Sequence, residues 1–121
     1  MNKQILTQTI QVADKQTSLI QYKSVPVMTT EQMAEFYGTD QVRIRQNYDR
    51  NNKRFSEGKH FFKIEGDDLR ELKNSLSSLK ILSLNTRSLT LWTEKGAARH
   101  AKILDTDQAW DIFEQLEEVY F

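Results

Sequence analysis

The residues best suited to a chemical role lie between Val42 and Phe62, in the stretch VRIRQNYDRNNKRFSEGKHFF. It holds six Lys or Arg against two carboxylates, with four Phe or Tyr interleaved, although the whole chain of 121 residues has a formal net charge of zero. Clustered cations of this kind suit the phosphates of nucleic acid. The stretch therefore predicts a surface for the DNA backbone. An ordinary solvated helix face is the alternative that composition leaves open.

A helix from Val42 to Phe55 would separate a packing face from a polar face. At about 100° per residue, Ile44, Tyr48 and Phe55 fall within about 40° of one another. The polar face, about 60° wide, carries Arg43, Asn47, Arg50 and Arg54. Because Arg and Asn can pair with guanine and adenine edges, base contacts are expected from Arg43, Asn47 and Arg50. Phosphate contacts are expected from Arg45, Lys53, Arg54, Lys59 and Lys63.

The wider pattern predicts a small α+β domain with short strands, hairpins and four to five helices. Residues 1–18 read as a polar leader, and residues 19–121 are expected to form a single domain. Leu19–Met28 is expected to form a hairpin with a break at Lys23 and Ser24. Pro26 favours an edge position or an irregular strand there.

Two helices in the first half are expected to form a helix-turn-helix-like pair. Thr29 and Gln32 make a capping-box pattern, and Gly38 stands where a helix ends. A second helix restarts soon afterwards, with Thr39 or Asp40 as its N-cap. In a helix-turn-helix the second helix enters the major groove, and here the strand at residues 59–64 would follow the DNA backbone beside it.

The second half is expected to alternate strands and capped helices. Strands are predicted at His60–Ile64 and Ser88–Trp92, with Asp67 or Asp68 capping the helix between them. The apolar stripe of that helix comprises Leu69, Leu72, Leu76 and Leu79. Residues 82–88 form a connection of uncertain form. Thr93 caps a further helix, and the last helix begins among residues 105–107.

Several function classes are disfavoured by what the sequence lacks. The chain has no cysteine, so disulfides and thiolate zinc sites are excluded, and the reducing cytoplasm is the expected location. No metal-ligand spacing, cofactor motif or catalytic motif occurs, so neither a cofactor nor enzymatic activity is expected. No apolar run is long enough to span a membrane. His60 is expected to pack or hydrogen-bond within its strand, whereas Arg99, His100 and Lys102 could add phosphate contacts.

The C-terminal segment raises the question of a protein partner. Residues 105–121 carry six carboxylates and no Lys or Arg. The apolar side of the last helix is expected to pack on the domain's own core. The alternative is a homodimer or partner surface made of Trp110, Phe113, Tyr120 and Phe121, and a dimer would present two DNA-reading helices.

Three segments carry a family resemblance: VPVMTTEQMAEFYG at residues 25–38, NKRFSEGKHFF at residues 52–62 and LWTEKGAARHAK at residues 91–102. With them, residues 19–121 resemble the KilA-N/Bro-N superfamily, and most closely the phage open-reading-frame-six N-terminal domain. This resemblance implies a compact α+β DNA-binding domain of bacteriophages and prophages. Residues that match the family's central motif are Arg50, Asn52, Arg54, Phe55, Gly58, His60 and Phe61.

The expected function is that of a phage or prophage regulatory domain of the antirepressor type, which binds double-stranded DNA in the cytoplasm of a bacterial host. The alternative is a protein-binding module that antagonises a repressor or a host protein. Family members often continue into a second module, so the chain is expected to be either a small stand-alone member or a truncated one.

Overall fold

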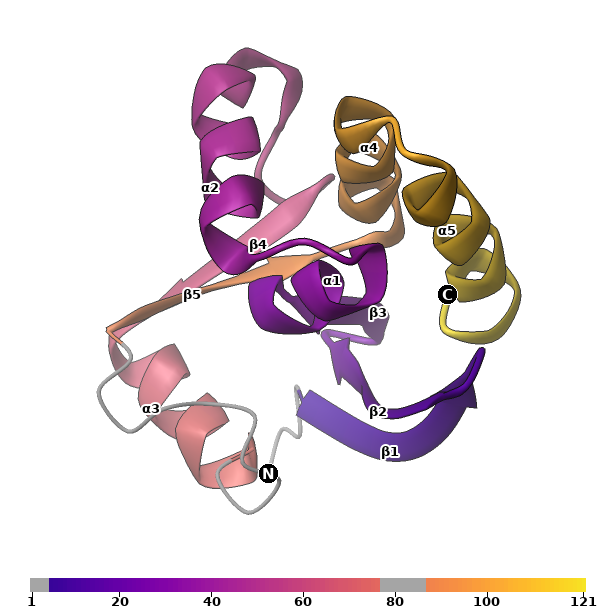
Figure 1. Cartoon of the computed structure of the whole chain (residues 1–121). Helices are drawn as coiled ribbons and strands as arrows, with labels where there is room; N and C mark the ends of the chain where they lie inside the picture. The colour runs from indigo at the N-terminus through magenta and orange to yellow at the C-terminus, as the bar shows by residue number, and fades with distance from the viewer. Residues whose placement is uncertain (1–4, 77–86) are drawn as a thin grey trace.

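The structure, a computed structural model, describes residues 5–76 and 87–121. Within these residues it is an α+β domain, as predicted, with five strands in one antiparallel sheet of order β1-β2-β3-β5-β4 and five α-helices (Figure 1). The strands are β1 (Ile5–Val12), β2 (Lys15–Tyr22), β3 (Val25–Thr29), β4 (Phe61–Glu65) and β5 (Ser88–Trp92). The helices are α1 (Thr30–Tyr37), α2 (Gln41–Arg50), α3 (Gly66–Leu76), α4 (Glu94–Leu104) and α5 (Asp107–Val119), with a short 3₁₀ helix, η1 (Asn52–Arg54).

Residues 5–18 are part of the sheet, which corrects their description as a polar leader. β1 pairs along its whole length with β2, from Ile5 opposite Tyr22 to Val12 opposite Lys15. The strand was missed because half of its residues are Thr or Gln, and among the residues whose burial is described, 6–12, only Val12 is fully buried. An edge strand needs few apolar residues when its partner strand supplies the hydrogen bonds.

The predicted hairpin at residues 19–28 is confirmed by the pairing of β2 with β3. Its turn residues, Lys23 and Ser24, have φ values of 52° and 66°, as a tight hairpin turn requires. β3 lies inside the sheet, but only Met28 and Thr29 pair with β5. Pro26 therefore stands where β3 has a neighbour on one side only, which is the local edge position that proline tolerates.

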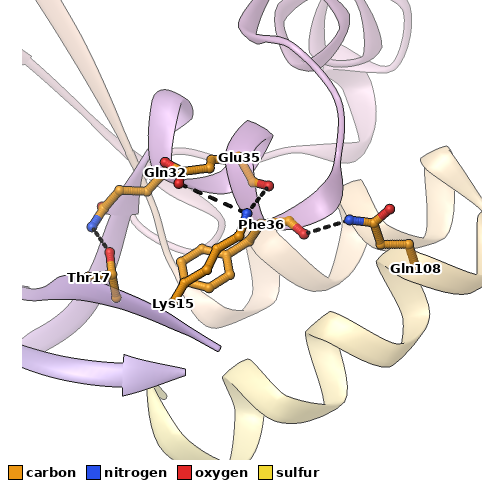
Figure 2. A network of polar contacts seen from close by, with 6 residues as sticks. All are labelled: Lys15, Thr17, Gln32, Glu35, Phe36 and Gln108. Carbon is orange, nitrogen blue, oxygen red and sulfur yellow. Dashed lines mark hydrogen bonds and ion pairs between the residues drawn. The ribbon is translucent and has the colours of Figure 1, made fainter. Parts of the chain in front are cut away.

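α1 begins and ends as the sequence predicted. Thr29 and Gln32 form both hydrogen bonds of a capping box, and Gly38 ends the helix in the left-handed region with φ 70°. Gln32 also donates from Nε2 to Thr17 Oγ1 (3.0 Å), which ties α1 to β2 (Figure 2). On its other side, Gln108 Nε2 of α5 donates to Phe36 O (3.4 Å). These contacts hold α1 between β2 and α5.

The predicted strands and caps of the second half are largely confirmed. β5 has the expected bounds, and β4 is shifted by one residue. Thr93 and Thr106 cap α4 and α5. α3 begins at Gly66, so Asp67 and Asp68 lie in its first turn, where acids favour the helix dipole. The predictions for Leu79 and for residues 82–86 fall outside the described residues.

Alternation along the central strands divides the core between the two faces of the sheet. Met28 and Trp92 belong to a cluster that includes buried residues of α1, α2, α4 and α5. Their neighbours Val27 and Leu91 belong to a second cluster, with two leucines of α3. α3 therefore lies apart from the other helices, as Figure 1 also shows. Among the helices described, none has both the length and the apolar character needed to cross a membrane.

Candidate nucleic-acid interface

α2 is anchored by the apolar side that the sequence predicted. Asp40 begins the helix by accepting a hydrogen bond from Arg43 N on Oδ1 (2.8 Å). Ile44 is fully buried, and the half-buried Tyr48 packs against Phe55 with ring centroids 5.4 Å apart. Because this side faces inward, the opposite side of α2 must face solvent.

The helix is shorter than expected. α2 ends at Arg50, because Asn51 leaves the helical region with φ −125° and ψ 24°, and η1 follows. The prediction of one continuous helix to Phe55 is therefore wrong. Arg54 is exposed, but it lies in η1 and does not share a helical face with Arg43 and Arg50.

Most of the predicted contact residues are exposed cations: Arg43, Arg45, Arg50, Lys53, Arg54, Lys59 and Lys63. Across residues 5–76 and 87–121, only Lys63 of this set makes an ion pair, with Glu65 at 3.4 Å. Both ends of that pair are more than half exposed, so water and salt screen it. The region thus presents cations that the protein itself leaves largely unneutralised. Asn52 is exposed beside them and donates from Nδ2 to Asp49 O (3.2 Å).

Asn47 does not belong to this surface, contrary to the prediction. It is 6% exposed, and its Nδ2 has no hydrogen-bond partner among the described residues. The physical reason is that α2 contacts α4 as well as α1. The covered arc of the helix is consequently wider than its apolar residues indicate.

Gln46, rather than Asn47, is the amide side chain that lies on the exposed side of α2. It is exposed, and at about 100° per residue it falls within about 60° of Arg43 and Arg50. Its side chain can make the same paired hydrogen bonds to adenine as asparagine. The spacing i, i+3, i+7 was visible in the sequence, but only the burial of Asn47 distinguishes the two amides.

Arg45 lies on a different side of α2. With Lys63 it lines a hollow of about 560 Å³ between α2 and the strands β4 and β5, where Glu31 and Asp49 are also found. At about 100° per residue, Arg45 is roughly 140° or more from Arg43 and Arg50. The predicted contact residues of α2 and β4 therefore divide between two surfaces. Arg43 and Arg50 lie on the outer side of α2, whereas Arg45 and Lys63 line this hollow.

His100 is fully buried, so the prediction of a phosphate contact from it is wrong. Its ring lies 4.3 Å from the Trp92 ring centroid, and neither ring nitrogen has a hydrogen-bond partner in the described structure. Burial lowers its pKa to about 4. His60 is also buried, and it packs on Phe55 with ring centroids 5.7 Å apart. Ser56 N lies 2.9 Å from its Nδ1, and Arg99 Nε lies 2.6 Å from its Nε2. No group of three or more His, Asp or Glu side chains suited to a metal occurs in the described ranges.

The aromatic residues of the C-terminal segment pack mainly on the domain itself. Tyr120 is 2% exposed and belongs to the core, so it cannot contribute to a partner surface. Phe113 and Phe121 are half-buried against the same core. Trp110 is 50% exposed, although its Nε1 donates to Asp105 Oδ1 (3.1 Å). Of the predicted partner surface, Trp110 is the residue that remains largely accessible.

A known sequence family matches most of the chain. The model of the ORF6N domain matches residues 17–103, from the early part of β2 to the last turn of α4. Neither the curated proteins nor the solved structures contain a significant match to this chain.

Proposed function

The chain belongs to the ORF6N domain family, which suggests a phage-associated regulatory domain, and on this premise we propose that it binds duplex DNA through α2 and η1. The observation that carries the proposal is the set of exposed cations on these two elements. They make no ion pair with any described residue: Arg43, Arg45, Arg50, Lys53 and Arg54. An unneutralised group of this kind gains free energy by releasing counterions from DNA.

The outer side of α2 is suited to the edges of bases. Arg43 and Arg50 can each make paired hydrogen bonds to guanine, and Gln46 between them can do the same with adenine. Lys53 and Arg54 follow in η1, where they would meet phosphates. In this arrangement α2 enters the major groove and α1 supports it from behind, as in helix-turn-helix proteins.

The regulatory role that we propose is of the antirepressor type, in a domain of the KilA-N/Bro-N superfamily that works in the bacterial cytoplasm. The domain would act by binding rather than by catalysis. Asn52, Arg54 and His60 match the central motif that the sequence shares with this superfamily. Of these, Asn52 and Arg54 are exposed and His60 is buried, so the motif would combine contact residues with a structural one.

The test is fluorescence-anisotropy binding to a mixed-sequence duplex over a series of salt concentrations. The parent protein is compared with the variant Arg43→Ala/Arg50→Ala and with the control Lys23→Ala/Arg70→Ala, which loses the same charge on the β2–β3 turn and on α3. We expect parent and control to bind with the same steep salt dependence. The α2 variant, which lacks two cations at the proposed DNA surface, should bind more weakly.

Two outcomes would contradict the proposal. If the parent shows no binding at low salt, DNA is not its ligand. If the α2 variant and the control lose affinity equally, the effect is one of net charge, and α2 is not the contact surface. Circular dichroism of each variant would establish that it is folded.

A second function, binding to a repressor, to a host protein or to another copy of the chain, is supported by α5. Its exposed side carries only acidic charges: Asp107, Asp111, Glu114, Glu117 and Glu118. Trp110 is half exposed among them, and exposed tryptophans are common anchors of protein interfaces. A Trp110→Ala variant that loses a protein partner while it keeps its DNA affinity would favour this second function.

A further inference from the structure

Arg99 of α4 is held by a buried histidine. Its Nε lies 2.6 Å from His60 Nε2, to which it donates a hydrogen bond. Ser56 N approaches the other ring nitrogen at 2.9 Å. Since a neutral imidazole has a single acceptor nitrogen, the shorter, charge-assisted bond from Arg99 is expected to prevail. Burial lowers the pKa of His60, and the positive charges of Arg99, Lys59 and Lys95 lower it further, which favours this neutral, accepting form.

A close approach of two backbones makes this contact possible. Thr93 N donates to His60 O (3.0 Å), and Thr93 Oγ1 donates to Lys59 O (2.7 Å). A Cβ at Gly96 would stand 2.0 Å from His60 O, so α4 can lie this near only because residue 96 is glycine. The start of α4 is thereby fixed against the loop that precedes β4.

This contact lies within a group of further cations. At about 100° per residue, Lys95, Arg99 and Lys102 fall within about 60° on the outer side of α4. Lys95 and Lys102 are exposed, Arg99 is half-buried, and Lys59 is exposed on the adjoining loop. Lys59 and Lys95 line the same hollow of about 230 Å³. The described residues offer none of the four cations an ion pair.

The arrangement leaves part of the guanidinium of Arg99 available. Nε is occupied by His60, and no hydrogen bond or ion pair involves the two terminal nitrogens within residues 5–76 and 87–121. Glu94 lines the hollow beside Lys95 but forms no ion pair with it. A guanidinium fixed at Nε presents its remaining N–H groups in a set direction, which suits a phosphate oxygen.

The position of α4 relates this group to the proposed DNA surface. α2 and α4 are in contact, and both rise beside β4 and β5 (Figure 1). Packed helices lie roughly 8–10 Å apart, and the major groove is about 12 Å wide. If α2 occupies the groove, its neighbour α4 meets the phosphates that border it.

We propose that Lys59, Lys95, Arg99 and Lys102 form a second contact with the DNA backbone, and that His60 is a positioning residue which orients Arg99 toward a phosphate. This inference rests on the proposed function and extends it to a surface that lies outside α2 and η1. It also gives His60 a role: the residue is buried and cannot touch DNA, yet its acceptor nitrogen sets the direction of an arginine that can.

The contact of the cations with phosphate is tested by the salt dependence of binding. Lys95→Ala and Arg99→Ala should each reduce the slope of log K against log salt by about 0.9, the value for one phosphate. The control Arg70→Ala removes one charge from α3, at the other end of β4, and should leave the slope unchanged. If Lys95→Ala and Arg99→Ala both behave like this control, the second contact does not exist.

The role of His60 is tested by variants that leave the charge of the protein unaltered at pH 8. His60→Leu removes the acceptor and should weaken binding by at least about twofold, the lower end for coupled residues. His60→Gln keeps an acceptor and should restore much of the affinity. In an Arg99→Ala background, His60→Leu should have no further effect. An equal loss with and without Arg99 would show that His60 acts on the fold alone.

The results also separate this inference from the proposed function. Loss of binding in the Arg43→Ala/Arg50→Ala variant, with parent-like slopes for Lys95→Ala and Arg99→Ala, would leave the function in place and overturn the second contact. Absence of salt-dependent binding by the parent would overturn both. Because Lys95 is exposed, its variant is expected to fold even where a change at His60 does not.

Discussion

Tyr120 and Val27 are joined by a hydrogen bond across 93 residues of sequence, in which the buried tyrosine hydroxyl donates to the backbone oxygen at 2.5 Å. The same hydroxyl accepts a bond from Ile20 N (3.1 Å). A residue just beyond α5 thus satisfies backbone groups of β2 and β3. The ORF6N match ends at residue 103, but the packed domain includes α5.

Tyr120→Phe is therefore expected to lower the free energy of unfolding by about 1–3 kcal/mol. The change leaves the N–H of Ile20 without this partner, and an unsatisfied buried group costs about that much. Urea denaturation measures the difference. Val119→Ala, at a side chain that is 50% exposed, is the control and should change stability far less. Equal stability of Tyr120→Phe and the parent would mean that water replaces the hydroxyl.

Gly96→Ala should strongly destabilise the domain. In an ordinary helix this change would stabilise by up to about 1 kcal/mol, because alanine has the higher helix propensity. Here the new Cβ would stand 2.0 Å from His60 O and 3.1 Å from the Trp92 ring. We expect a loss of about 1–3 kcal/mol, the usual cost of overpacking. A thermal melt decides the sign.

Ala98→Gly provides the matched control on α4. It makes the reverse exchange at a half-buried position and should cost only the propensity difference of about 1 kcal/mol. A stabilised Gly96→Ala variant would show that α4 can move away from the loop before β4, and the contact between Arg99 and His60 would then be adjustable rather than fixed.

His100 should make the fold sensitive to acid. Its pKa is lowered from 6.5 to about 4 by burial. Between these two pH values, His100 is protonated in the unfolded chain but neutral in the folded protein. The contribution of His100 to the free energy of unfolding is therefore fully present above about pH 6.5. It is lost as the pH is lowered toward 4, and the loss is at most about 3 kcal/mol. His100→Leu should remove this part of the pH dependence.

The measurement is the free energy of unfolding at several pH values, and the difference between parent and His100→Leu isolates this histidine from His60 and from the carboxylates. The difference should change between pH 6.5 and 4 and stay constant between pH 7 and 8. A difference that is flat over the whole range would mean that His100 is charged or hydrated in the folded protein.

Local signals in the sequence predicted much of the fold. The capping oxygens of Thr29, Asp40 and Thr93 lie where the sequence placed them, because a cap depends on a side chain and on backbone within three residues. The period of Ile44 and Tyr48 likewise identified the packing side of α2. β1 escaped detection because its apolar residues, Ile5, Leu6, Ile10 and Val12, do not alternate regularly with its Thr and Gln residues.

The predictions for the candidate site were wrong where the position of a residue is set by the backbone path or by contacts between residues far apart in the sequence. Asn47 is buried because α4, some 50 residues later, covers that side of α2. Nothing near Asn47 distinguishes it from the exposed Gln46. Arg54 was assigned to the wrong face because the backbone leaves the helix at Asn51. Lys95 escaped notice because its place beside Lys59 results from the packing of α4 on the loop before β4.

The variant Asn47→Leu tests whether Asn47 contacts DNA, as the sequence predicted, or is buried, as in the structure. Asn47 is 6% exposed, and its Nδ2 has no hydrogen-bond partner in the described part of the chain. Replacing an unsatisfied buried amide by an apolar side chain of similar size should be neutral or stabilising. DNA affinity and its salt slope should match the parent. Urea denaturation and anisotropy measure the two quantities on the same sample.

The matched comparison for that variant is Gln46→Leu, which also replaces an amide side chain by leucine but on the exposed side of α2. On a duplex selected for tight binding, it should lose about 1–3 kcal/mol of binding free energy, the usual value of a paired base contact. On mixed-sequence DNA it should bind almost as the parent does, since no phosphate contact is removed. If Asn47→Leu lost the specific affinity and Gln46→Leu kept it, α2 would have to turn on binding, and the buried face seen here would not be the one that faces DNA.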